Sequence, residues 1–154
     1  MNLEQAQKVA GDLVAELAPF CERVEPAGSI RRRKSWVNDI DLVIIPRNQG
    51  LLAQKLHDLG CRFGGPKLQR FPYKGIQVDV YVATPETWAT LLLIRTGSTR
   101  HNVELATKAK TRGWHLKANG EGLHDHQGQR VAGDTEESIF KALGLPYKEP
   151  WERE

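Results

Sequence analysis

The sequence predicts an α+β fold, because helical and strand patterns both occur within one chain of 154 residues. Three stretches carry the prediction. Apolar side chains recur at helical spacing between residues 3 and 17, a β-branched apolar run fills residues 40–45, and apolar and polar side chains alternate over residues 76–82. A chain of this length can bury one core, and we expect two parts, residues 1–84 and residues 85–154.

Proline and glycine set the ends of the elements expected in the first part. Pro19 stops the opening helix, Pro46 ends the apolar strand, and Gly60 closes the second helix. The expected elements are a helix over residues 3–18, a strand over 23–27, a strand over 40–45, a helix over 51–59, and two strands over 67–71 and 76–83 that form a hairpin.

Capping residues and turn signals organise the second part. Thr84 and Pro85 are expected to start a helix that runs to about Arg95, and Ser98 can cap the next helix. Asn119-Gly120 is a strong hairpin signal between residues 114–118 and 121–124. A capping box at residues 134–137 begins a last helix that Gly144 ends, and residues 145–151 are expected to pack back on the core.

Composition excludes several classes of protein. Residues 91–94 are the centre of an apolar run far too short for a membrane span, and the first residues lack the pattern of a signal peptide. We therefore expect a cytoplasmic or nucleoid-associated protein, not a secreted one, with no membrane partner. Cys21 and Cys61 lack metal-ligand spacing and are expected to be reduced thiols. Three histidines allow a zinc hypothesis, which their loose spacing makes weak: His115, His124 and His126.

Charge is distributed unevenly along the chain. The formal net charge is +3, but from Gly120 onward four Lys or Arg residues stand against eight Asp or Glu residues, a net charge of −4. The remainder therefore carries +7. A basic body of this kind suits a polyanionic partner such as nucleic acid, although scattered surface lysines explain it equally well.

Three acidic residues point to a divalent metal site. Asp39 and Asp41 are separated by one residue at the start of the apolar strand, so their side chains project from the same face. Asp79 lies opposite the apolar face of its own alternating strand, and it would join them if the two strands pair. Oxygen ligands of this kind suit Mg²⁺, and three carboxylates can hold a pair of ions about 3.5 to 4 Å apart.

A Gly28-Ser29 turn and a cationic run precede these acids. A glycine lets backbone approach a phosphate, and the serine hydroxyl can donate to it, but an ordinary turn is the alternative. The run Arg31-Arg32-Arg33-Lys34 is either a phosphate-binding surface or a solvated charge cluster. For Trp36, packing is favoured over stacking on a base.

Together these residues resemble the palm of a family X DNA polymerase. The Gly-Ser turn, the spaced Asp39 and Asp41, the strand of Asp79 and a Thr96-Gly97-Ser98 turn followed by Asn102 carry the resemblance. The C-terminal segment from Thr135 to Pro150 is similar to the end of bacterial and viral members. The resemblance covers nearly the whole chain, and it includes the small viral forms without the lyase and helix-hairpin-helix domains.

The resemblance implies a fold, a reaction and roles for particular residues. The fold would be a nucleotidyltransferase palm, a mixed sheet with flanking helices over residues 1–84, plus a small C-terminal α/β subdomain over residues 85–154 that binds nucleotide and base pair. The reaction would be addition of a nucleotide from a dNTP to a DNA primer 3′-hydroxyl with two Mg²⁺ ions, which Mn²⁺ could replace, in gapped or primer-template DNA during short-gap repair. The implied metal ligands are Asp39, Asp41 and Asp79; the implied nucleotide contacts are Gly28, Ser29, Arg32, Asn38, Thr96, Gly97 and Asn102; and the DNA contacts are Arg31, Arg33, Lys34, Arg100, Lys108 and Lys110.

Four positions depart from the family pattern and leave template dependence, ribose selectivity and fidelity open. Gln77 and Ala106 stand where animal members carry arginines, and Ile94-Arg95 replaces an aromatic pair beside the sugar. Two alternatives therefore remain beside a templated polymerase. One is a template-independent or RNA-directed nucleotidyltransferase, and the other is a DNA-end binding module without catalysis.

Overall fold

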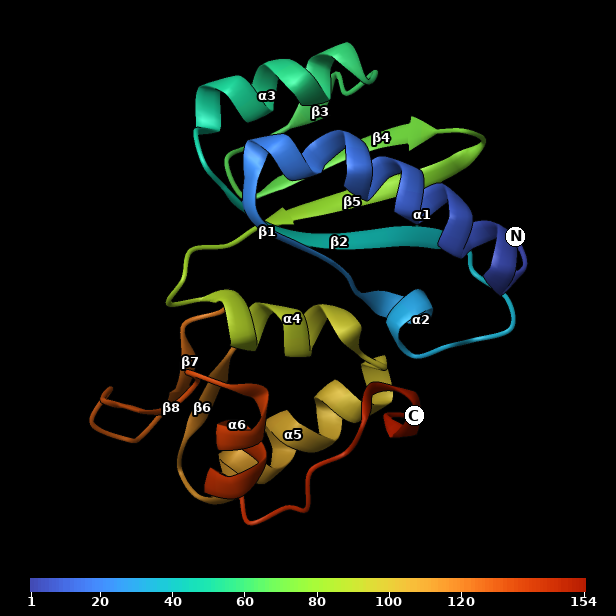
Figure 1. The fold of residues 1–154 in the computed structure, drawn as a ribbon. Helices are drawn as coiled ribbons and strands as arrows, with labels where there is room; N and C mark the ends of the chain where they lie inside the picture. Colours follow the sequence, from blue (N-terminus) through green and yellow to red (C-terminus); the bar gives the residue numbers. More distant parts are fainter. The chain divides into compact units, whose positions relative to one another are not determined.

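The computed structural model describes residues 1–154 apart from the side chain of Phe63, and it divides into two compact units, Met1–Ala83 and Thr84–Glu154. Figure 1 shows the elements of both units. Within the residues that the structure describes, no helix is both long and apolar enough to span a bilayer.

The first unit is built around a mixed five-stranded sheet with the order β1-β2-β5-β4-β3 (Figure 1). Its elements are α1 (Leu3–Leu17), a 3₁₀ turn η1 (Ala18–Phe20), β1 (Cys21–Pro26), α2 (Gly28–Arg31), β2 (Asp39–Pro46), α3 (Gln49–Asp58), β3 (Phe63–Gly64), β4 (Leu68–Tyr73) and β5 (Ile76–Val82). Strands β2 and β5 are parallel, and the other neighbouring pairs are antiparallel. The condition set for Asp79 to join Asp39 and Asp41, that their two strands pair, is therefore met.

One face of this sheet forms the core of the unit. Ile40, Leu42 and Ile44 of β2 are completely buried, as are Val78 and Val80 of β5. The apolar stripe of α1 and the inner side of α3 pack against this face. Side chains alternate along a strand, so the acids of β2 and β5 point to the opposite face.

Local signals fix the helix ends in this unit. Asn2 caps α1, since its Oδ1 accepts from Gln5 N at 2.8 Å, and the helix stops at Leu17, before Pro19. The expected turn at Gly28-Ser29 is in fact the first part of the short helix α2. Gly28 adopts φ +56°, a left-handed value that glycine takes without steric cost, and it therefore starts the helix at a sharp change of direction.

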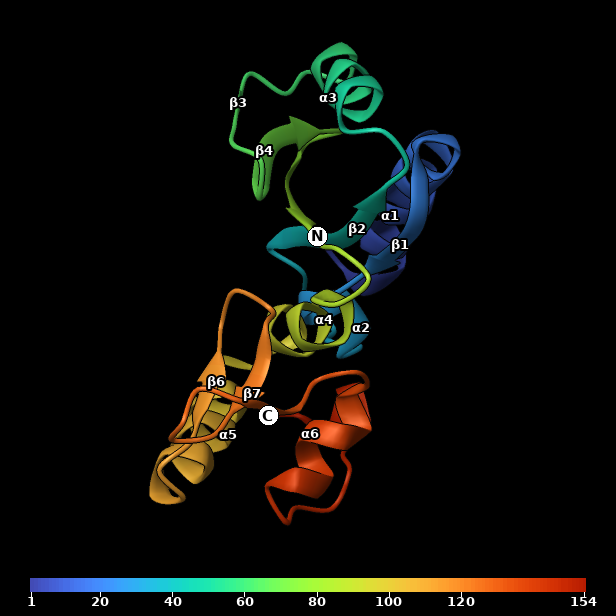
Figure 2. The same ribbon diagram turned by 90° about the vertical axis from the view of Figure 1, so that its left-hand side faces the viewer.

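The second unit combines helices with a three-stranded antiparallel sheet of order β6-β7-β8. Its elements are α4 (Trp88–Thr96), α5 (Thr99–Thr111), β6 (His115–Lys117), β7 (Gly122–His124), β8 (Arg130–Ala132), α6 (Glu136–Ala142) and a 3₁₀ turn η2 (Pro150–Glu152). Figure 2 shows β6 alongside α5, and β7 pairs with β6. Leu93, Leu105, Leu123 and Phe140 lie in the shared core, and Leu145 and Tyr147 of the returning C-terminal segment pack against it as predicted.

The prediction that α4 starts at Thr84 is wrong. Residues 84–87 form a separate turn in which Thr87 N donates to Thr84 O at 3.1 Å and Thr84 N donates to Thr87 Oγ1 at 2.9 Å. Because these bonds close the turn on itself, the helix begins only at Trp88. Strand β8 was not expected at all, since its three residues are too short to show an alternating pattern.

Candidate active site

Asp41 and Asp79 are direct register partners on the parallel strands β2 and β5. Asp39 is paired with Gln77 in the same register, so the three acids and Gln77 share the face opposite the core. Asp79 is buried, Asp41 is half-buried and Asp39 is exposed. The sheet thus brings the three predicted metal ligands onto one face, and their exposure to solvent increases from Asp79 to Asp41 to Asp39.

Arg70 makes an ion pair with Asp79 that the sequence analysis missed. Arg70 lies opposite Asp79 in the antiparallel β4–β5 pair, and its Nε donates to Asp79 Oδ1 at 2.7 Å. The hydrogen bond and charge of Asp79 raise the pKa of the Arg70 guanidinium above its ordinary value. A sequence signal existed, because the two-residue turn at Lys74-Gly75 sets the hairpin register and places Arg70 across from Asp79.

The start of α2 is attached to β2 beside Asp41. Ala27 N donates to Asp41 O at 2.8 Å, and Gly28 follows directly. A Cβ atom added to Gly28 would lie 2.2 Å from Asp41 Oδ2. The hydrogen atom of glycine is therefore the only substituent that fits between this helix start and the carboxylate, which places Gly28 and Ser29 next to the acids.

The cationic run begins in the last residue of the short helix α2 and continues into the loop that follows it. Arg31 ends α2, and Arg32 N donates to Gly28 O at 3.1 Å as its C-cap. Arg33 has φ +58°, which turns the chain toward Lys34, and Arg33 is exposed whereas Arg31, Arg32 and Lys34 are half-buried. Asn38 is exposed at the entrance to β2. These residues put several cations within one short loop of Asp39 and Asp41.

The carboxylate oxygens of the three acids are suitable ligands for divalent ions, but the three side chains do not converge on one point. Within the residues that the structure describes, no three His, Cys, Asp or Glu side chains are close enough to share a metal ion. Arg70 already supplies a positive charge to Asp79, which indicates that this carboxylate attracts a cation. The residues that would hold a metal are Asp39, Asp41 and Asp79, and the Arg70 guanidinium shares the oxygen atoms of Asp79.

The predicted site residues of the second unit cluster where α4 meets α5. Thr96 ends α4, and its buried hydroxyl donates to Leu92 O at 2.6 Å. The peptide bond from Gly97 to Ser98 is cis, and Ser98 Oγ caps α5 by accepting from His101 N at 3.2 Å. Asn102 Nδ2 donates to Ile94 O at 2.8 Å, while its Oδ1 is buried and accepts no hydrogen bond.

The predicted DNA-contacting residues of α5 lie on its solvent side. Arg100 pairs with Glu104 one turn later at 3.7 Å, and Lys108 and Lys110 are exposed in the last turns. Cations at this end also favour the helix dipole, so their position alone does not require a nucleic acid. Among the departing positions, Ile94 packs on the core of the unit, while Arg95 and Ala106 are exposed.

The described histidines of the second unit do not form a zinc site. His124 is paired with His115 across strands, and both of its ring nitrogens contact backbone carbonyls, of Gly128 at 3.1 Å and Glu121 at 2.9 Å. That use of both nitrogens argues against the zinc hypothesis.

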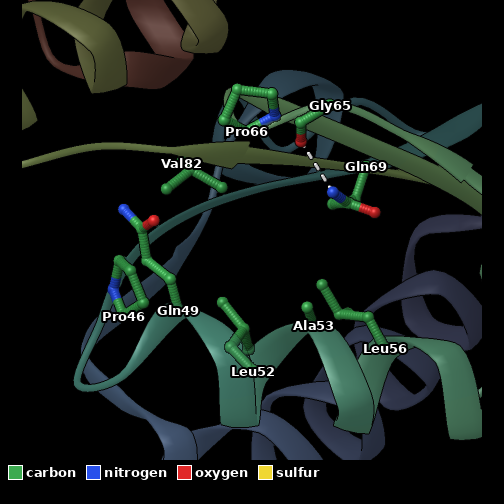
Figure 3. Close-up of a pocket in the computed structure, with 9 residues that line it drawn as sticks. All are labelled: Pro46, Gln49, Leu52, Ala53, Leu56, Gly65, Pro66, Gln69 and Val82. Carbon is green, nitrogen blue, oxygen red and sulfur yellow. Dashed lines mark hydrogen bonds between the residues drawn. The ribbon is translucent and has the colours of Figure 1, made fainter.

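A pocket of about 170 Å³ between α3 and the β4–β5 hairpin is apolar, and its lining residues are Pro46, Gln49, Leu52, Ala53, Leu56, Gly65, Pro66, Gln69 and Val82 (Figure 3). None of these side chains can titrate, so this pocket is not a catalytic candidate.

Several known proteins similar to this chain are DNA polymerases. The family model "DNA polymerase beta thumb" matches residues 91–154. DNA polymerase lambda of Rattus norvegicus is 30% identical over 159 residues, which cover 82% of this chain and 28% of that protein. Repair DNA polymerase X of African swine fever virus is 25% identical over 174 residues and covers 99% of both chains. The chain therefore spans less than a third of the rat relative but nearly the whole viral one.

A solved structure has the same fold. Polymerase beta of Leishmania infantum, in a ternary P/T complex, superposes with a TM-score of 0.85 at 19% identity, over 100% of this chain and 76% of that one. The likeness confirms the predicted α+β class, with a mixed sheet and flanking helices.

Proposed function

Because this chain belongs to family X of the DNA polymerases, we propose that it adds nucleotides from dNTPs to the 3′-hydroxyl of a DNA primer. The first unit would be the catalytic palm, and the second would bind the nucleotide and the nascent base pair. Gapped or primer-template DNA would be the substrate, and short-gap repair the setting.

One observation carries the proposal. Asp41 and Asp79 are register partners on parallel strands, and Asp39 projects from the same face two residues before Asp41. Three carboxylates on one face supply the kind of ligands that two-metal nucleotidyl transfer requires around a reacting phosphate. The cations of residues 31–34 and the backbone of α2 come directly before the strand that carries Asp39 and Asp41.

The acids and cations have distinct proposed roles. Asp39, Asp41 and Asp79 would hold the divalent ions. When bound, Mg²⁺ or Mn²⁺ would lower the pKa of the primer hydroxyl and neutralise charge on the leaving pyrophosphate. Ser29, the backbone N–H of Asn38 and Arg32 would orient the triphosphate, and the planar guanidinium of Arg32 suits phosphate oxygens.

The second unit would contribute nucleotide contacts through its α4–α5 junction. Thr96, Gly97 and Asn102 would lie near the sugar and the base of the bound nucleotide. Phosphates of the DNA would be bound by a set of exposed or half-buried cations from the two units: Arg31, Arg33, Lys34, Arg100, Lys108 and Lys110.

Primer extension tests this function against its alternatives. A labelled primer is offered with one dNTP and Mg²⁺, either at a one-nucleotide gap or as an untemplated single strand. We expect insertion of only the templated nucleotide at the gap. Extension of both substrates would instead establish a template-independent transferase.

The Asp79→Ala variant separates catalysis from DNA binding in the same assay. Loss of extension with DNA binding retained is the expected result, and Asp58→Ala, a substitution of an exposed acid on α3, should leave extension unchanged. Absence of extension by the unmodified chain on both substrates, with gapped DNA still bound, would favour a binding module without catalysis.

A further inference from the structure

Trp36 is the most exposed of the large apolar side chains in the described part of the chain. Its exposed fraction is 62%, whereas Trp88 of the second unit is 95% buried. The expectation that Trp36 packs into the protein is therefore wrong. Indole rings are usually covered because leaving so much apolar surface in water is unfavourable.

The backbone on both sides of Trp36 is nevertheless firmly held. Trp36 forms a β-bridge with Asn2, Leu3 N donates to Ser35 O at 3.2 Å, and Val37 N donates to Met1 O at 2.8 Å. Val37 is completely buried. The indole is thus presented to solvent from an ordered backbone, and little conformational entropy would be lost when a ligand covers it.

The charge around Trp36 indicates what kind of ligand would cover it. Four consecutive cations, residues 31–34, end two residues before it, and Asp39 of the candidate active site lies three residues after it. The other exposed large apolar side chains belong to other elements, including Leu51 on α3 and Val103 on α5. A single exposed aromatic ring two residues from a cationic run matches a base and its phosphates, whereas a membrane or protein partner calls for a broader apolar patch.

We propose that Trp36 is a stacking platform for an unpaired base of the DNA strand, while Arg31, Arg33 and Lys34 bind the phosphates that flank this base. The proposal rests on the proposed function in that it takes DNA as the ligand. It adds a second type of contact, which reads the presence of an exposed base but not its identity, because every base has a flat aromatic face.

Binding of fluorescein-labelled single-stranded oligonucleotides, measured by anisotropy, tests this role. Trp36→Leu should weaken binding of an intact strand about 5- to 100-fold, and Trp36→Phe should recover much of the loss because it keeps a ring. The matched control is Trp151→Leu, which removes the other exposed tryptophan and should change binding little. Thermal unfolding of each variant checks that the fold is intact.

An oligonucleotide with abasic positions separates stacking from a purely structural effect. Unmodified protein should bind the abasic strand about as weakly as Trp36→Leu binds the intact strand, and the variant should not distinguish the two strands. Equal binding of intact and abasic strands by the unmodified protein would overturn the proposal, as would an unchanged affinity in Trp36→Leu.

Failure of the inference and failure of the proposed function can be told apart. If the unmodified chain extends a gapped primer but Trp36→Leu binds single strands normally, only the stacking role is lost. If the unmodified chain binds neither gapped nor single-stranded DNA, both are lost.

Discussion

Arg70 Nε lies 2.7 Å from Asp79 Oδ1, so a guanidinium occupies one side of a proposed metal-binding carboxylate. Asp79 is buried whereas the side chain of Arg70 is about half exposed. The arginine can therefore swing away into solvent without exposing core surface. It is placed to neutralise Asp79 when no metal is bound and to compete with a metal for the same oxygen atoms.

Removal of that competitor should strengthen metal binding. Arg70→Gln is expected to bind Mn²⁺ a few-fold more tightly in the absence of DNA and nucleotide, because ion pairs of half-exposed side chains are weak. Electron paramagnetic resonance of free Mn²⁺ measures the affinity. Arg70→Lys, which keeps the positive charge, should bind Mn²⁺ like the unmodified chain, and an equal gain in both variants would contradict competition by charge.

The same substitution should couple stability to the metal. Without Arg70 the buried carboxylate of Asp79 lacks its charged partner, so the Tm of Arg70→Gln should fall in the presence of a chelator and recover with Mg²⁺. A Tm of the variant that does not respond to Mg²⁺ would show that Asp79 does not bind the ion.

Gly28→Ala should damage the site more than the fold. The new methyl group would meet Asp41 Oδ2, and φ +56° costs alanine about 1 kcal/mol. We expect kcat/KM for primer extension to drop at least about 10-fold with a modest loss in Tm. Gly11→Ala on α1 is the control: nothing lies within 4 Å of the new Cβ, so activity should persist and stability should rise.

His101 should make the second unit less stable in acid. Burial lowers the pKa of this histidine to about 4, and the nearby positive charge of Arg153 adds to the effect. Between pH 6.5 and 4 this histidine is protonated in the unfolded chain, where its pKa is about 6.5, but stays neutral in the folded chain. The free energy of unfolding should therefore fall as the pH drops below about 6.5 and level off near 4, by no more than about 3 kcal/mol.

Chemical denaturation at several pH values measures this dependence. His101→Leu should flatten the part of the pH profile between 6.5 and 4, whereas His126→Asn, at an exposed position, should leave it as it is. An unchanged slope in His101→Leu would assign the acid sensitivity to other groups.

Arg153 should be a main stabilising contact of the second unit. Its side chain is completely buried, with Nη1 2.7 Å from Glu136 Oε2, Nε 3.0 Å from Lys148 O and Nη2 3.2 Å from Tyr147 Oη. Arg153→Met leaves Glu136 buried without its cation and should cost about 3 to 5 kcal/mol of unfolding free energy. The control is Lys117→Met, which breaks an exposed pair with Glu121 and should change stability little.

The sequence predicted the parts of the fold that depend on local pattern. The strand that carries Asp41 was recognisable from its continuous β-branched apolar run, and the strand that carries Asp79 from its apolar alternation, while Asn119-Gly120 located the hairpin of β6 and β7. Asp41 opposite Asp79 was expected only on the condition that the two strands pair. That pairing joins segments far apart in the chain, and the structure supplies it.

Features that depend on tertiary surroundings escaped the sequence. Trp36 is exposed because residues near Asn2 hold its backbone at the surface, and no pattern around the tryptophan records this contact. The late start of α4 follows from hydrogen bonds between Thr84 and Thr87 that compete with a first helical turn. The roles proposed for Ser29, Arg32, Asn38 and Asn102 stay predictions.

The measurement that most directly tests the proposed chemistry is single-nucleotide insertion at a gap by the Asp41→Asn variant, with Mg²⁺, beside the unmodified chain and Asp58→Asn. Asparagine keeps the size of the side chain but removes the negative charge that a divalent ion needs. The account predicts a rate at least about 100-fold lower in Asp41→Asn, with the fold and gapped-DNA binding retained, and an unchanged rate in Asp58→Asn. Insertion by Asp41→Asn at the unmodified rate would contradict a catalytic site at Asp39, Asp41 and Asp79.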